Sequence, residues 1–281
     1  MAISLLNNIS ALAASNALQV TQTNLQKTLF QLSSGSRINT GADDAAGLAI
    51  ANGLQANVTA LTQSASNAND GVGALQVSDG ALAQVTTLLN RAVTLATESA
   101  NGTVSDAQRT AINAEFTQIK AEIDRIGSST TFNGTSVFTA TSTDIFLTDA
   151  SSASANSTIS VTVGSLASNA IGYNGSTIDL SGDSLTSSTT ATAALADINN
   201  AISNVAGLRG TIGAGINRLQ SAANVINSQI QNLTAAQDQI TAANIPQQVT
   251  NLSEYSILNQ SGISALAQAN SAQQSILKLL Q

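Results

Sequence analysis

Apolar residues spaced three and four apart, over long stretches without proline, constrain this chain more than any other feature. They occur in residues 54–96, 112–126 and 195–240, and the 281-residue sequence contains one proline. Proline interrupts helices, whereas this spacing places apolar side chains along one stripe of a helix. The sequence therefore predicts a mainly α fold, an elongated antiparallel coiled-coil rod formed by N- and C-terminal segments.

The same spacing predicts which residues form each seam. The first seam comprises Leu54, Val58, Leu61, Ala65, Ala68, Val72, Leu75, Asp79, Leu82, Thr86, Leu89, Val93 and Ala96. The third comprises Leu195, Ile198, Ile202, Val205, Arg209, Ile212, Ile216, Leu219, Ala223, Ile226, Ile230, Leu233, Gln237 and Ile240. The shorter middle helix is expected to start at a capping-box signature, Ser105 to Gln108, and to end at Gly127.

Residues 139–190 differ from the helical segments in kind. No Lys or Arg occurs between Arg125 and Arg209, and Ser, Thr, Gly and Asn dominate. Short apolar–polar alternations and the dipeptides Asn133-Gly134 and Asn174-Gly175 are typical of β-hairpins. We predict a small β-rich surface segment, inserted between the helices and exposed at the tip of the rod. A disordered Ser/Thr linker is the alternative.

The composition excludes several classes of function. The chain has no Cys and no His, which removes thiol chemistry, Cys/His zinc sites and the usual neutral-pH general base. Its net charge of −7 argues against a nucleic-acid partner, and no apolar run is long enough to span a bilayer. We expect no enzyme activity, no cofactor, no metal and no membrane insertion. The N-terminus lacks a basic residue before Lys27 and makes a poor secretory signal.

The two ends of the chain are amphipathic but almost uncharged. No charged side chain occurs in residues 2–26 or between Glu254 and Lys278. The apolar residues expected to form subunit interfaces there are Leu5, Ile9, Leu12, Leu25, Leu29, Leu32, Ile263, Leu266, Leu277 and Leu280.

Such ends suit an interface between copies of the chain. A buried Leu contributes roughly 1.5–3 kcal/mol, whereas ordering the backbone costs about 1–2 kcal/mol per residue, so a lone helix with one thin stripe is unstable. We expect the ends to be poorly ordered in the monomer and to fold when many copies meet. The alternative is that the two ends pack on each other within one chain.

The stretch at residues 33–54 combines the spaced glycines Gly35, Gly41 and Gly47 with Arg37, Asp43 and Asp44. It lacks the Lys-Ser or Lys-Thr of a phosphate loop, and two carboxylates are too few for an oxygen-ligand metal site. We predict that the carboxylates cap free backbone N–H groups at the start of the long helix. Arg37 is the residue expected to contact a neighbouring subunit.

Three longer segments carry a family resemblance. LSSGSRINTGADDAAGLAIANGL (32–54), NDGVGALQVSDGAL (69–82) and VTNLSEYSILNQSGISALAQANSAQQSILKLL (249–280) resemble the terminal regions of bacterial flagellins. The likeness covers roughly residues 1–138 and 195–281, with both ends in the order and spacing of the family. Because its middle segment is short, the chain resembles a minimal flagellin that lacks most of the variable outer domains.

The resemblance implies a domain organisation and a function. Residues 1–43 with 243–281 would form the filament core, residues 44–138 with 191–242 the rod, and residues 139–190 the inserted surface segment. The protein would be an extracellular structural subunit that polymerises into the flagellar filament for motility, after export in an unfolded state through the flagellar type III pathway. The implied partners are further copies of itself, an export chaperone, the filament cap and hook-associated proteins.

One departure from the family concerns the Toll-like innate receptor. Flagellins that it senses carry an Arg-x-Arg-Glu-Leu pattern, whereas the matching stretch here keeps Arg91 and Leu95 but has Val93 and Thr94 in place of Arg and Glu. Recognition is expected to be weakened or absent, and Arg91 is equally well interpreted as a solvated residue of the rod.

Two alternative functions remain open at this point. A hook–filament junction protein would share the terminal helices, and a secreted surface adhesin would use the Ser/Thr-rich middle segment.

Overall fold

The computed structural model describes residues 8–139, 142–148, 157–173 and 175–279. The chain divides into two compact units, one of residues 57–231 and the other of residues 1–56 with 232–281. The division falls inside the two longest helices, α2 (Ala45–Ala100) and α4 (Ser188–Thr241).

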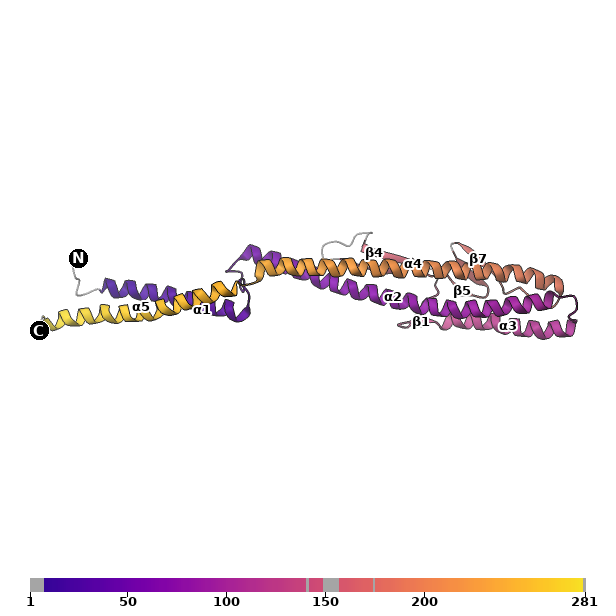
Figure 1. Ribbon diagram of the computed structural model, residues 1–281, viewed down its shortest axis with the longest axis horizontal. Helices are drawn as coiled ribbons and strands as arrows, with labels where there is room; N and C mark the ends of the chain where they lie inside the picture. Colours follow the sequence, from indigo (N-terminus) through magenta and orange to yellow (C-terminus); the bar gives the residue numbers. More distant parts are fainter. Residues whose placement is uncertain (1–7, 140–141, 149–156, 174, 280–281) are drawn as a thin grey trace. The chain divides into compact units, whose positions relative to one another are not determined.

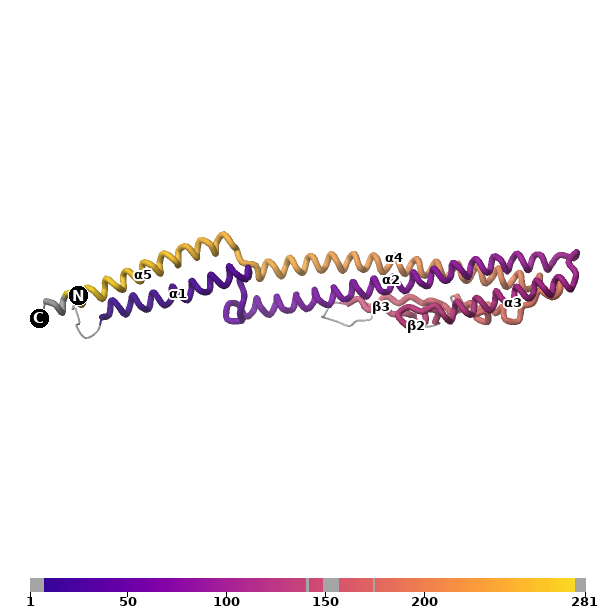
Figure 2. Tube along the Cα trace, turned by 90° about the horizontal axis from the view of Figure 1, so that it is seen from below, coloured from indigo at the N-terminus to yellow at the C-terminus, as the bar shows by residue number. Residues whose placement is uncertain are grey.

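The unit of residues 57–231 is an antiparallel bundle of α2, α4 and α3 (Asp106–Ser129) with short strands along its side. Figures 1 and 2 both show α3 and the strands lying beside the two long helices. The strands are β1 (Thr131–Phe132), β2 (Thr135–Ser136), β3 (Ser142–Phe146), β4 (Thr158–Thr162), β5 (Leu166–Ala167), β6 (Ala170–Tyr173) and β7 (Ser176–Ile178). They pair as β1-β2, β3-β4 and β5-β6-β7, all antiparallel.

The buried seams repeat every seven residues, and half of each was predicted. The confirmed half comprises Leu61, Ala68, Leu75, Leu82, Leu89 and Ala96 in α2 with Ile198, Val205, Ile212, Leu219 and Ile226 in α4. Of the other predicted positions, Ala223 is also buried, whereas residues such as Val72 and Ile216 are only half-buried and pack against the edge of the core. The buried residues in their place are Ser64, Gly71, Ser78, Val85, Ala92 and Ser99 in α2 and Ala194, Ala201, Leu208 and Gly215 in α4.

Small residues on the seam make room for the strands. A Cβ atom on Gly71 would lie 2.8 Å from Ile145, and one on Gly215 would lie 2.9 Å from Val161. A Cβ on Gly127 would overlap the backbone carbonyl of Leu166. Gly127 therefore permits the approach of β5 and does not end α3, which continues to Ser129.

The β-rich segment was predicted to be exposed at the tip of the rod. It instead packs along the bundle. Its inner side chains, among them Ile145, Val161 and Ile171, are at most 7% exposed and belong to the same core as the long helices. Burial of these side chains favours packing on the helices over projection into solvent. The predicted hairpin at Asn133-Gly134 is confirmed, with φ angles of 50° and 77° between paired strands β1 and β2. Asn174, in the second predicted turn, lies outside the described residues.

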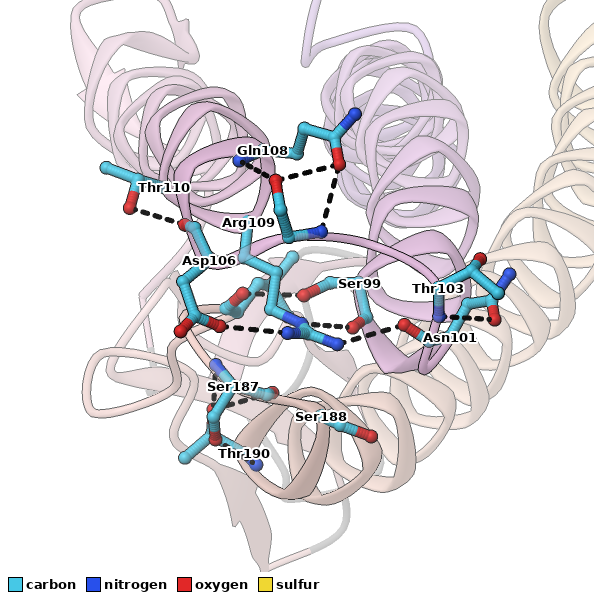
Figure 3. Close-up of polar contacts among 12 residues, drawn as sticks. Ser99, Asn101, Thr103, Asp106, Gln108, Arg109, Thr110, Ser187, Ser188 and Thr190 are labelled. Carbon is cyan, nitrogen blue, oxygen red and sulfur yellow. Dashed lines mark hydrogen bonds and ion pairs between the residues drawn. The ribbon is translucent and has the colours of Figure 1, made fainter.

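Arg109, which is only 8% exposed, stabilises the turn between α2 and α3 (Figure 3). Its guanidinium donates to the carbonyls of Ser99 (2.9 Å) and Asn101 (2.9 Å) at the C-terminal end of α2 and pairs with Asp106 (3.0 Å). Positive charge is favourable at this end of a helix. The capping box between Ser105 and Gln108 is present as predicted.

The other unit contains α1 (Ile9–Ser34) and α5 (Ile245–Leu279), which pack antiparallel. Asn8 donates to the carbonyl of Ala269 (3.2 Å), and Gly262 faces Leu18 midway along the pair. Within one chain the two ends therefore pack on each other, as the alternative interpretation expected. Pro246 occupies the first turn of α5, where a proline costs no helical hydrogen bond.

Replacement of Gly127 by Ala tests the close approach between α3 and β5. Overpacking of a dense core costs about 1–3 kcal/mol, which exceeds the gain of about 0.5–1 kcal/mol from a helical Gly-to-Ala change. We expect Gly127→Ala to lower the unfolding midpoint of the helical signal in guanidinium. Gly213→Ala in α4, where a Cβ meets no atom within 4 Å, is the control and should raise that midpoint. Equal shifts in the two variants would contradict the assignment.

Candidate functional site

The α1–α5 pair leaves large apolar side chains uncovered. Ile9 is 71% exposed, Leu12 63%, Leu29 47% and Ile263 52%. Further exposed apolar residues in this unit are Val20, Phe30, Ile50, Ile245, Val249, Ile257 and Leu258. The unit of residues 57–231 has far fewer, with Val77, Phe146 and Val225.

The predicted interface residues fall into three groups. Ile9, Leu12, Leu29 and Ile263 lie on the exposed surface, whereas Leu25, Leu32 and Leu266 are half-buried between the helices. Leu5 and Leu280 and the side chain of Leu277 lie outside the described residues.

Several exposed apolar residues do not belong to the predicted stripe. Val20, Phe30 and Leu258, which are not among the predicted interface residues, are also exposed. Conversely, the polar Thr28 and Gln31 are buried at 4% and 8% exposure. The apolar surface is therefore broader than one stripe, a property visible in the sequence only when every apolar position on both helices is counted.

Residues 35–44, here called the connector, link α1 to α2 and are hydrogen-bonded to the end of α4. Gly35 adopts φ 70° and accepts a hydrogen bond from the N–H of Ala243 (2.9 Å). The Arg37 guanidinium donates to the carbonyl of Ile240 (2.7 Å), and the Ser36 hydroxyl donates to that of Thr241 (3.0 Å). Arg37 thus holds free carbonyls at the C-terminal end of α4, where its charge is favourable.

Asp44 and Asp43 have different roles in the connector. The Asp44 carboxylate accepts from the N–H of Gly47 (2.9 Å) at the start of α2, which is the geometry of an N-cap. Asp43 instead accepts from the N–H and hydroxyl of Thr40 (both 3.0 Å) and pairs with Lys27 (2.7 Å). It therefore holds the connector loop rather than the helix.

Lys27 and the hydrogen bonds from Thr40 lower the pKa of Asp43 from 3.8 to about 2. Both contacts favour the charged form.

Within the described residues, no group of three or more His, Cys, Asp or Glu side chains could hold a metal ion. No described helix combines the length and apolar character needed to cross a membrane.

The two residues at the predicted receptor position lie in different environments. Arg91 is exposed and forms a two-pronged ion pair with Glu115 (2.7 and 3.0 Å). Leu95 is 2% exposed and packs in the core. A receptor could reach Arg91 but not the Leu95 side chain in the folded unit.

The fold and this surface define a class of protein before any comparison. The described residues offer a complete core in one unit and, in the other, a helix pair with an uncovered apolar surface. That combination is typical of structural subunits that complete their packing with further copies.

Comparison with known proteins identifies the family. Residues 5–143 match the bacterial flagellin N-terminal helical region, and residues 195–280 match the bacterial flagellin C-terminal helical region. The flagellar filament 30.7 kDa core protein of Treponema maltophilum is 33% identical over 280 residues, and flagellin FlaB1 of Treponema pallidum is 32% identical over 282; each alignment covers 98% of both chains. The chain belongs to the bacterial flagellin family and is a structural subunit of an extracellular flagellar filament.

A solved structure supports the fold alone. A Vibrio parahaemolyticus protein described as flagellar hook-associated matches 71% of this chain and 100% of its own, with a TM-score of 0.56 and 16% identity. At that identity the match says nothing about function.

The lowered pKa of Asp43 predicts an acid transition confined to the connector. Because the folded-state value is depressed, the stabilisation is complete above 3.8, the ordinary value, and is lost as the pH falls through about 2. NMR should show the Asp43 carboxyl titrating near 2, with the Asn39 and Thr40 amides exchanging faster below that pH. Lys27→Gln should raise this pKa toward the ordinary value. Titration of wild-type Asp43 near 3.8 would contradict the geometry.

Proposed function

We propose that this chain polymerises into the flagellar filament through the surface of the α1–α5 pair. The observation that carries the proposal is the set of uncovered apolar side chains on both helices, ten of which are 42–71% exposed. Each such side chain contributes roughly 1.5–3 kcal/mol when fully buried. Burial against identical copies is therefore the driving force for assembly.

The scarcity of charge on these helices supports the same proposal. Among the described side chains, α1 carries only Lys27 and α5 only Glu254. An isolated charge is costly to remove from water, whereas amides and hydroxyls can be buried with hydrogen bonds. A helix pair that is polar almost entirely through Asn, Gln, Ser and Thr can be surrounded on all sides by other subunits.

The domains of the chain then take separate roles. Residues 1–43 with 243–281 form the inner filament core, residues 44–138 with 191–242 form the surrounding rod layer, and residues 139–190 form the inserted surface segment. Arg37 acts in the core domain, where it stiffens the connector and contacts a neighbouring subunit.

Export and partners follow from the family. The chain leaves the cell unfolded through the flagellar type III pathway, with an export chaperone, and meets the filament cap and hook-associated proteins outside. It needs no cofactor and performs no catalysis. Recognition by the Toll-like receptor is weak or absent, because the Arg and Glu of the sensed pattern are replaced by Val93 and Thr94 and because Leu95 is buried.

Polar substitution of the uncovered residues separates assembly from folding. Leu12→Gln and Ile263→Gln should leave the unfolding midpoint of the monomer within about 0.5 kcal/mol of wild type, because exposed positions contribute little to stability. Both should prevent salt-induced growth of filaments seen by electron microscopy. Gln19→Ala, an exposed change on the same helix, is the control and should assemble normally.

Long wild-type filaments, grown unaided or from seeds, would also exclude the junction-protein and adhesin alternatives. Normal filaments from both Gln variants would contradict the proposed surface.

A further inference from the structure

A groove runs along the outer side of α4 in the unit of residues 57–231. It has a volume of about 660 Å³ and lies between α4, the outward face of β4 and the β6-β7 hairpin. Residues lining it include Ser160, Thr162, Tyr173, Leu208, Thr211 and Arg218. Its lining combines apolar side chains with hydroxyl groups and one positive charge.

Close packing at glycines shapes this groove. A Cβ on Gly164 would overlap the carbonyl of Gly172, and a Cβ on Gly207 would lie 2.5 Å from the Tyr173 ring. Tyr173 of β6 therefore packs directly on α4, and Gly164 packs directly on the backbone of β6, so closely packed segments bound the groove.

Arg218 differs from the other basic residues of the chain. The sequence has nine Lys and Arg residues, and the structure describes the side chains of all but Lys278. Seven of the eight donate to a carboxylate or a backbone carbonyl of the same chain: Lys27, Arg37, Arg91, Arg109, Lys120, Arg125 and Arg209. Among the described residues Arg218 is exposed and has no such partner.

The lining of the groove suits a carboxylate. A guanidinium binds a carboxylate through two parallel hydrogen bonds. The hydroxyls of Ser160 and Thr162 lie on the exposed side of β4, form no hydrogen bond within the described residues and can donate to the same group.

Copies of this chain supply that carboxylate in excess. The sequence has 16 Asp and Glu residues against nine basic ones. Within the described residues, five exposed acidic side chains have neither an ion pair nor a hydrogen bond: Asp70, Glu98, Asp144, Asp238 and Glu254. Asp144 lies directly opposite Ser160 in the β3-β4 pair of the same chain, beside the groove. Every copy of the chain presents the other four carboxylates, at a high effective concentration in a homopolymer.

We propose that the groove around Arg218 is a contact between subunits, in which the guanidinium binds a carboxylate of a second copy of this chain. The inference rests on the proposed function, because only assembly brings the second copy to the groove. It adds a directional, salt-dependent contact on the rod to the apolar contact made by the terminal helices.

The test measures the critical concentration for filament assembly at several salt concentrations. Loss of an exposed ion pair in Arg218→Ala should raise the critical concentration about three-fold. The repulsion introduced by Arg218→Glu should raise it about ten-fold. Arg218→Lys should fall between wild type and Arg218→Ala. The effect should shrink as salt rises. Arg125→Ala, which changes the net charge equally but lies outside the groove, should assemble like wild type.

Charge exchange identifies the partner. Arg218→Glu combined with a Lys substitution at Asp70, Glu98, Asp238 or Glu254 should restore assembly toward wild type in one of the double variants. Circular dichroism of each monomer controls for folding. Wild-type-like assembly of Arg218→Ala and Arg218→Glu, an equal loss in Arg125→Ala, or no restoring exchange would each overturn the inference. The proposed function would stand in those cases, and it would fail only if wild-type chains formed no filaments.

Discussion

The burial of apolar surface that one chain cannot complete is the constraint on which this structure depends. Two helices in contact cover one stripe on each other, and α1 and α5 carry apolar residues on more than one stripe, from Leu12 to Phe30. In the unit of residues 57–231, α3 and the strands cover the apolar surface that α2 and α4 do not bury against each other. Leu82, Leu89 and Ile198 are fully buried there. One unit is therefore complete in the monomer, whereas the other has apolar surface left for a neighbour.

Scarce charge is distributed in a consistent way across the chain. Arg109 and Arg37 hold free carbonyls at the C-terminal ends of α2 and α4, and Lys120 donates to the carbonyls of Leu180, Ser181 and Asp183 in the loop before α4. Basic side chains thus stabilise the places where the backbone has unpaired acceptors. Among the described side chains, α1 and α5 carry only Lys27 and Glu254, so their faces are almost free of charges that would oppose close packing between subunits.

The sequence predicted features that depend on local chemistry or on apolar character. The capping box at Ser105, the hairpin at Asn133-Gly134 and buried seam residues such as Leu75, Leu82 and Leu89 are of this kind. It failed where small residues form the core, because Ser64, Gly71 and Gly215 carry no apolar signal yet lie against the strands. The position of the β-rich segment and the groove around Arg218 depend on how distant segments pack, and periodicity along a single helix contains no information on that packing.

Hydrogen exchange of monomer and filament, followed by mass spectrometry of peptides, tests the central claim most directly. Peptides from α1 and α5 should exchange rapidly in the monomer and slowly in the filament, because their apolar surface finds partners only after assembly. Peptides from the core of residues 57–231 should be protected in both states. Equal protection of the terminal helices in monomer and filament would contradict the claim that neighbouring copies complete their packing.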